Sequence, residues 1–153
     1  MLEFAEEFRE EGDDRFDPLV EDPEAFFELA DRFERDLDLP EDRVPMTHYL
    51  LYKGERIVAM SRLRRRLIPV LLLDGGNIGY EVRRSERRLG YASEILGRTM
   101  EEARALGLKR VLLTTEDLNV GSIRVIEKAG GVRDSDSISP RTGDRMRRFW
   151  ISL

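Results

Sequence analysis

The sequence predicts one α/β domain of the α+β kind, in which a mixed sheet carries helices on its faces. An alternating segment with β-branched residues, 77–82, is followed after a short turn by a segment of helical periodicity, 91–106. The same order then recurs, with an apolar segment at 109–115 before a second helical segment at 119–128. Two further alternating segments are joined by a turn around Gly54, which predicts an antiparallel hairpin.

The first 42 residues predict an arm of two amphipathic helices. The first helix covers residues 2–11 and ends near Gly12. For the second helix, Asp22-Pro23 supplies a cap and a first-turn proline, and Leu39-Pro40 ends it. Its apolar side holds Phe26, Phe27, Leu29, Ala30, Phe33 and Leu37.

The remaining residues, 44–153, predict a core that forms one domain with the arm, because no linker or repeat interrupts residues 1–153. The hairpin strands are expected at 49–52 and 57–60, the second extending through the basic stretch 62–67. Gly75 and Gly76 form a turn before the central strand 77–82, Gly107 stops the helix 91–106, and Gly130-Gly131 stops the helix that begins at Asn119. Further strands are expected near 133–137 and at 146–153.

Composition excludes several kinds of site. The 153 residues contain no cysteine, which excludes disulfides, thiolate metal sites and a cysteine acyl-enzyme. His48 is the single histidine, so a histidine-rich metal centre is excluded and we expect no metal. The best apolar run, 67–73, is too short to cross a membrane, and the acidic N-terminus lacks the features of a signal peptide. We therefore expect a cytoplasmic protein without a membrane partner.

Charge is divided unevenly along the chain. Residues 1–42 hold 18 acidic and 4 basic side chains, a net charge of −14, whereas residues 43–153 hold 22 basic and 13 acidic side chains, a net charge of +9. A basic core suits a polyanionic ligand. The acidic arm either attracts a cationic substrate or packs on the basic core for stability. Nucleic acid is not an expected partner, because the whole chain is acidic and its basic residues are not interleaved with aromatic ones.

The turn at residues 87–92, Arg-Arg-Leu-Gly-Tyr-Ala, predicts a seat for a pyrophosphate. It lies between a strand and the first turn of a helix, where free N–H groups and the positive end of the helix dipole favour an anion. Gly90 permits a close approach to the backbone, while Arg87 and Arg88 add bidentate donors.

Arg87-x-x-Gly90-x-Ala92 after a strand resembles the acyl-CoA pyrophosphate loop of the GNAT superfamily of N-acetyltransferases. The segment from Asn119 to Glu127-Lys128-Ala129-Gly130 is similar to the next helix of that family, and the resemblance covers roughly residues 44–153. Val44-Pro45-Met46-Thr47 and the ending Arg148-Phe149-Trp150-Ile151 resemble a subgroup of uncharacterised predicted acetyltransferases. The resemblance implies a mostly antiparallel sheet with a splayed central strand pair, acetyl-CoA as cosubstrate, an unidentified amine acceptor and a possible homodimer.

The resemblance also implies which residues contact the cofactor, and the central strand is expected to bulge at Gly79, which otherwise marks tight packing. Backbone N–H groups of that strand would then stabilise the oxyanion and bind the pantetheine arm. The implied cofactor contacts are Val82, Arg83, Arg87, Arg88, Leu89, Gly90, Tyr91, Ala92, Asn119 and Ser122. Asn119 also suits a helix cap, which is compatible with a cofactor contact.

Five residues are candidates for proton transfer. Glu81, on the central strand, is either a general base or an ion-pair partner for one of many arginines. His48 and its neighbour Tyr49 are further candidates for the base, although a single histidine is more often structural. The tyrosine that many family members use as general acid is replaced by Ile126, and Tyr91 or Tyr80 are candidate substitutes.

The resemblance therefore predicts an acetyl-CoA-dependent N-acetyltransferase that acts on a primary amine by direct attack. The alternative is a non-catalytic acyl-CoA-binding sensor. A phosphate binder of another fold is disfavoured, because neither Gly-x-x-x-x-Gly-Lys-Ser/Thr nor Gly-x-Gly-x-x-Gly occurs.

Overall fold

The computed structural model describes residues 1–153. The arm contains α1 (Leu2–Glu10), the 3-10 turn η1 (Asp14–Phe16), α2 (Asp17–Glu21) and α3 (Pro23–Glu34). The core continues with β1 (Met46–Lys53), β2 (Arg56–Arg64), α4 (Pro69–Leu73), β3 (Ile78–Val82), the 3-10 turn η2 (Arg84–Glu86) and α5 (Tyr91–Ala105). It ends with β4 (Arg110–Glu116), α6 (Val120–Lys128), β5 (Val132–Arg133), β6 (Ser137–Ile138) and β7 (Arg145–Ser152).

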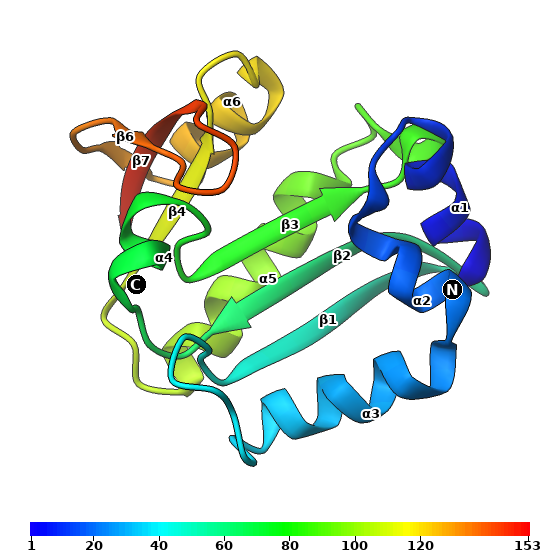
Figure 1. Cartoon of the computed structure of the whole chain (residues 1–153). Helices are drawn as coiled ribbons and strands as arrows, with labels where there is room; N and C mark the ends of the chain where they lie inside the picture. Colours follow the sequence, from blue (N-terminus) through cyan, green and yellow to red (C-terminus); the bar gives the residue numbers. More distant parts are fainter.

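The strands form two antiparallel sheets that diverge from one another (Figure 1). The first sheet has the order β1-β2-β3, and the second has the order β4-β7-β5, with β6 also paired to β7. No ladder joins β3 to β4, although the two strands are neighbours. The central pair is therefore splayed, as the sequence predicts.

A hinge formed by Gly76 and Asn77 joins the two sheets just before β3. The Asn77 amide donates to the carbonyl oxygen of Leu112 (2.7 Å), and Asn77 Oδ1 accepts from the Leu112 amide (2.9 Å). Asn77 Nδ2 donates to the carbonyl oxygen of Arg64 on β2 (3.0 Å). A Cβ on Gly76 would lie 2.3 Å from the Leu112 carbonyl oxygen, so only glycine permits this approach. The two strands can diverge only beyond this hinge.

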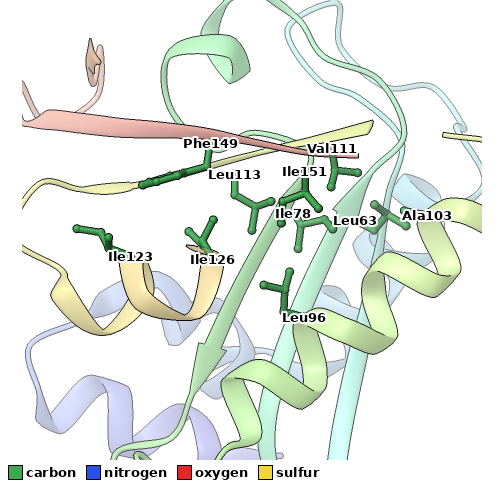
Figure 2. Packing of buried hydrophobic residues seen from close by; sticks show 10 residues of the cluster. All are labelled: Leu63, Ile78, Leu96, Ala103, Val111, Leu113, Ile123, Ile126, Phe149 and Ile151. Atoms are coloured by element: carbon green, nitrogen blue, oxygen red, sulfur yellow. The ribbon is translucent and has the colours of Figure 1, made fainter. Parts of the chain in front are cut away.

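One hydrophobic core spans both sheets on the face that α5 and α6 cover. Figure 2 shows Leu96 of α5 and Ile126 of α6 near Ile78 of the first sheet and Leu113 of the second. All four side chains are at most 1% exposed. Because this core closes the base of the splay, α5 and α6 are held with their N-termini near the end of β3.

The arm covers the opposite face of the first sheet (Figure 1). Phe4, Phe8 and Phe16 form a triangle with ring-centroid distances of 4.9, 5.0 and 5.4 Å. This triangle packs on Ile57 and Met60 of β2. Aromatic burial of this kind makes the arm a part of the fold rather than a loose extension.

The predicted helices and strands are largely confirmed. Asp22 caps α3 by accepting from the Ala25 amide (3.0 Å), and Asn119 caps α6 by accepting from the Ser122 amide (3.0 Å). The extension of the second hairpin strand through 67 is wrong, because β2 ends at Arg64 and the apolar residues that follow form α4. The single strand expected near 133–137 is two short strands, β5 and β6.

Candidate active site

A cleft of about 550 Å³ lies where β3 ends, between the N-termini of α5 and α6 and beside α1. Its walls combine segments that are far apart in the sequence, because the splay brings them to one place. The lining residues are Phe8, Arg15, Tyr80, Glu81, Val82, Glu86, Arg87, Arg88, Gly90, Tyr91, Ala92, Ser93, Asn119, Gly121, Ser122 and Val125. They include every expected cofactor contact except Arg83 and Leu89.

The loop before α5 presents a run of free amides to the cleft. The N–H groups of residues 88–93 donate to no backbone carbonyl, and no side chain caps α5. Arg88 (φ +65°) and Gly90 (φ +92°) adopt left-handed conformations, which are typical of turns whose successive N–H groups converge on an anion. The positive end of the α5 dipole adds to this attraction. The arrangement is that of a phosphate site.

The edge of β3 that faces away from β2 is also open. β3 pairs with β2 along Ile78–Val82 without a register shift, and the Arg83 amide continues this pairing by donating to the Val58 carbonyl oxygen (3.1 Å). Because antiparallel pairing alternates, Tyr80 and Val82 direct their N–H and C=O groups to the other edge. An extended ligand could pair with this edge as an added strand does.

The expected bulge at Gly79 is wrong, since the pairing of β3 with β2 is regular there. A Cβ on Gly79 would lie 3.4 Å from Nη2 of Arg62, so this glycine gives room to the neighbouring guanidinium. The splay arises at the Gly76-Asn77 hinge instead, before β3 begins.

Glu81 is a buried carboxylate in the wall of the cleft, with a side chain only 5% exposed. Its Oε1 accepts from Arg15 Nη1 of the arm (3.0 Å) and from Arg62 Nη2 of β2. Its Oε2 is buried and has no hydrogen-bond partner. Glu81 is therefore an ion-pair partner through one oxygen, while its other oxygen is unpaired.

Arg87 contributes a guanidinium that the arm already binds. Its Nη1 and Nη2 donate to Oε1 and Oε2 of Glu11, both at 2.6 Å. Its Nε donates to the carbonyl oxygen of Val82 (3.1 Å), at the open edge of β3. Arg88, the other arginine of the turn at residues 87–92, forms no ion pair.

A family model, "Acetyltransferase (GNAT) family", matches residues 4–131. The chain belongs to the GNAT acetyltransferase family. No curated protein sequence matches it.

Solved structures agree on this GNAT fold. The YncA protein of Salmonella typhimurium, solved with its cofactor acetyl-CoA, has a TM-score of 0.62 at 14% identity, covering 88% of this chain and 73% of that one. An N-acetyltransferase from Staphylococcus aureus Mu50 has a TM-score of 0.62 at 16% identity, with coverage of 87% and 76%. A ribosomal-protein-alanine N-acetyltransferase from Brucella melitensis has a TM-score of 0.64 at 15% identity, with coverage of 88% and 78%.

Some residues expected in this GNAT site lie outside the cleft. The Arg83 side chain is 3% exposed and donates to Glu7, while its amide is used by Val58, so it offers the cleft no backbone contact. The Leu89 side chain is 60% exposed and only its amide belongs to the free run. His48 does not line the cleft. Burial and the charges of Arg62 and Arg64 lower the pKa of His48 to about 4, so its ring is neutral at neutral pH.

Two tyrosines line the cleft. Lys53 Nζ lies 5.8 Å from the ring centroid of Tyr91. Tyr80 reaches across the splay, and its hydroxyl lies 2.9 Å from Ser122 Oγ on α6. Burial raises the pKa of Tyr80, so its hydroxyl keeps its proton at neutral pH. Ile126, in the position of the family's tyrosine, is 1% exposed and packs in the hydrophobic core (Figure 2), and it is not among the residues that line the cleft.

The arm supplies cleft residues that sequence reasoning missed. Phe8 and Arg15 line the cleft although they precede the rest of the site by more than 60 residues. The uneven charge of the two parts of the chain was the available signal for this contact. The packing alternative is supported, because Glu7, Glu10 and Glu11 of the arm pair with Arg83, Arg84 and Arg87 of the core. Attraction of a cationic substrate by the arm stays a prediction.

Two classes of site are not found in the structure. No group of three or more His, Cys, Asp or Glu side chains is arranged to hold a metal ion. No helix has both the length and the apolar character needed to cross a bilayer.

Proposed function

We propose that this protein is an acetyl-CoA-dependent N-acetyltransferase that moves an acetyl group to a primary amine by direct attack. The observation that carries the proposal is the run of free amides at residues 88–93, beside the open edge of β3, in a GNAT chain. The amides suit the pyrophosphate of coenzyme A. The open edge suits the amide groups of its pantetheine arm. The residues present therefore fit the cosubstrate at both ends of the cleft.

Acetyl-CoA supplies an activated acetyl group: the amine nitrogen bonds to its carbonyl carbon, the C–S bond breaks, and the nitrogen loses a proton. Without cysteine the chain cannot form a cysteine acyl-enzyme, so the amine attacks while both substrates are bound. The N–H groups of Tyr80 and Val82 on the open edge are the proposed donors to the developing oxyanion.

Glu81 is the proposed base, acting through Oε2. Arg15 and Arg62 bind Oε1 and hold the carboxylate in place, which leaves Oε2 to accept the proton directly or through a water molecule. Tyr80 is the proposed proton donor to the leaving thiolate, because its hydroxyl lies on the cleft wall beside α6.

The second candidate function is an acyl-CoA-binding sensor without catalysis. Ile126 favours it, since α6 brings no hydroxyl to the cleft at this position. A thiolate leaves without an acid more easily than an alkoxide does, so this observation bears on the rate more than on the reaction.

Release of the coenzyme A thiol separates the two functions. The purified protein would be mixed with acetyl-CoA and a pool of primary amines, amino acids and peptides, and free thiol would be measured with a thiol reagent. Because the chain has no cysteine, the entire signal comes from coenzyme A. We expect acceptor-dependent release and an acetylated product by mass spectrometry. The N,N-dimethyl analogue of each active amine is the control, because it has no N–H proton to lose. Binding of acetyl-CoA without release by any amine would establish the sensor instead.

A further inference from the structure

Helix α1 lies beside the basic loop that follows β3 (Figure 1), and three carboxylates at the C-terminal end of this helix pair with arginines of the loop. Glu7, Glu10 and Glu11 lie at positions i, i+3 and i+4, so they share one face of the helix. Each binds a different guanidinium of the loop: Glu7 binds Arg83 (2.5 Å), Glu10 binds Arg84 (2.9 Å) and Glu11 binds Arg87 (2.6 Å). The three pairs differ in burial, which gives them different roles.

Glu7 is the anchor of this face. Its partner Arg83 is 3% exposed, and Glu7 also accepts from the amide (3.1 Å) and the hydroxyl (2.9 Å) of Ser85. Burial alone would raise the pKa of Glu7, but the hydrogen bonds from Arg83 and Ser85 outweigh it and lower the pKa to about 2. Together with the triangle of Phe4, Phe8 and Phe16, this pair holds α1 in place independently of Glu11.

The Glu11–Arg87 pair is different, because Arg87 lines the cleft next to the free amides of residues 88–93. The side chain of Arg87 is 44% exposed, and one carboxylate binds both terminal nitrogens of its guanidinium. Two oxygens of a phosphate group present the same geometry to this fork. Glu11 therefore sits where an anionic ligand of the loop would bind Arg87.

Glu11 is also weakly placed. It is the C-terminal cap residue of α1, where the negative end of the helix dipole disfavours a carboxylate. A half-exposed ion pair contributes little to stability, so replacement of the Glu11 carboxylate by another anion costs little free energy. Since the anchor at Glu7 remains, only the Glu11 side chain has to move.

We propose that Glu11 is a built-in competitor of the acyl donor, occupying Arg87 until the donor's pyrophosphate displaces it. This inference rests on the proposed function, because it assigns the displacing anion to coenzyme A. The arm thereby lowers the affinity of the loop for the donor, and donor binding releases the carboxylate of Glu11 into solvent.

The test compares Glu11→Gln with Glu10→Gln by calorimetric titration with coenzyme A. Both variants remove one negative charge from this face of α1, but only Glu11 pairs with an arginine that lines the cleft, because Arg87 lines it and Arg84, the partner of Glu10, does not. Loss of the competitor should tighten coenzyme A binding about threefold to tenfold in Glu11→Gln and leave Glu10→Gln near the parent. Pantetheine, which lacks the pyrophosphate, should bind the parent and Glu11→Gln equally.

A second comparison repeats the titration in a protein that lacks Arg87. In an Arg87→Gln background, Glu11→Gln should give no gain, because the guanidinium that both anions share is absent. Equal gains in coenzyme A affinity in Glu10→Gln and Glu11→Gln would show that only the net charge matters. Weaker binding in Glu11→Gln would mean that Glu11 orients Arg87 for the ligand. Either result would contradict the proposal that Glu11 competes with the donor. If no protein, the parent included, binds coenzyme A, the proposed function fails first and the inference falls with it.

Discussion

Glu81 has two unequal carboxylate oxygens, and this inequality defines the chemistry expected of it. Two arginines from different parts of the chain bind Oε1, whereas Oε2 is buried at the cleft wall without a partner. A purely structural ion pair would satisfy both oxygens, because an unpartnered buried acceptor lowers stability. The free oxygen thus supports a role toward a ligand.

Replacement of Glu81 by glutamine keeps the side-chain shape and removes the proton acceptor. If Glu81 is the base, kcat should fall about a hundredfold while the affinity for acetyl-CoA stays near that of the parent, as measured by steady-state kinetics and titration. A fall of less than about threefold would contradict the role.

Arg15→Gln provides the matched control for this residue. It leaves the carboxylate of Glu81 in place but removes one of the two guanidinium groups that bind its Oε1. Because Arg62 still binds Oε1, kcat should fall much less in Arg15→Gln than in Glu81→Gln, as measured in the same steady-state assay. An equal fall in the two variants would indicate that the loss comes from the broken ion pair and not from the missing base.

At the scale of elements, the hinge before β3 determines where the cleft opens. The Asn77 side chain replaces the backbone pairing that β3 would otherwise make with β4, and Gly76 lets the two strands approach at the base. Beyond this point the strands diverge, which leaves the edge of Tyr80 and Val82 open.

Asn77→Ala should loosen this hinge. The substitution leaves the buried Leu112 amide and the Arg64 carbonyl oxygen without their side-chain partner, which should lower the free energy of unfolding by about 1–3 kcal/mol. KM for acetyl-CoA should also rise, because the spacing between β3 and β4 is less well defined. Denaturant unfolding and kinetics provide the two measurements. Asp22→Ala, which removes the cap of α3 away from the cleft, is the control for stability. If neither the free energy of unfolding nor the KM for acetyl-CoA changes in Asn77→Ala, the hinge does not need this side chain.

At the scale of the whole molecule, the acidic arm and the basic core are held together by aromatic packing and by paired charges. The arm fills one face of the first sheet, brings Phe8 and Arg15 to the cleft, and places Glu11 on Arg87. Its position therefore connects the stability of the fold to the state of the site.

The Glu7 anchor predicts a defined pH dependence of stability. Its pKa is about 2 in the folded protein and 4.5 in the reference state, so the unfolded state binds more protons between these values. The stabilisation is fully present above about pH 4.5 and is lost as the pH falls toward 2. The parent should thus be more stable than Glu7→Gln by a constant amount above pH 5, and the difference should shrink below it. A difference independent of pH down to 2 would contradict the anchor.

The features that could be predicted from the sequence are those that depend on neighbouring residues in the chain. Asp22, Asn119 and Gly107 act within a few residues of themselves, as helix caps and a stop, so their roles follow from nearest-neighbour chemistry. Gly79 was misread because a lone glycine in a strand does not say what needs the space, and here it is Arg62. The pairing of Arg15 with Glu81 spans 66 residues, and no periodicity or motif encodes such a contact.

The central claim is that the N-terminus of α5 binds acetyl-CoA, and Gly90 tests it most directly. Gly90 (φ +92°) and Gly107 (φ +86°) lie at opposite ends of α5, and a Cβ on either meets no atom within 4 Å. Gly90→Val and Gly107→Val therefore introduce similar backbone strain, but only Gly90 lines the cleft.

The measurement is the shift in melting temperature on adding millimolar acetyl-CoA, since a ligand stabilises the folded state that binds it. We expect a clear upward shift for the parent and for Gly107→Val, and none for Gly90→Val. No shift in the parent, or an equal shift in both variants, would contradict the claim.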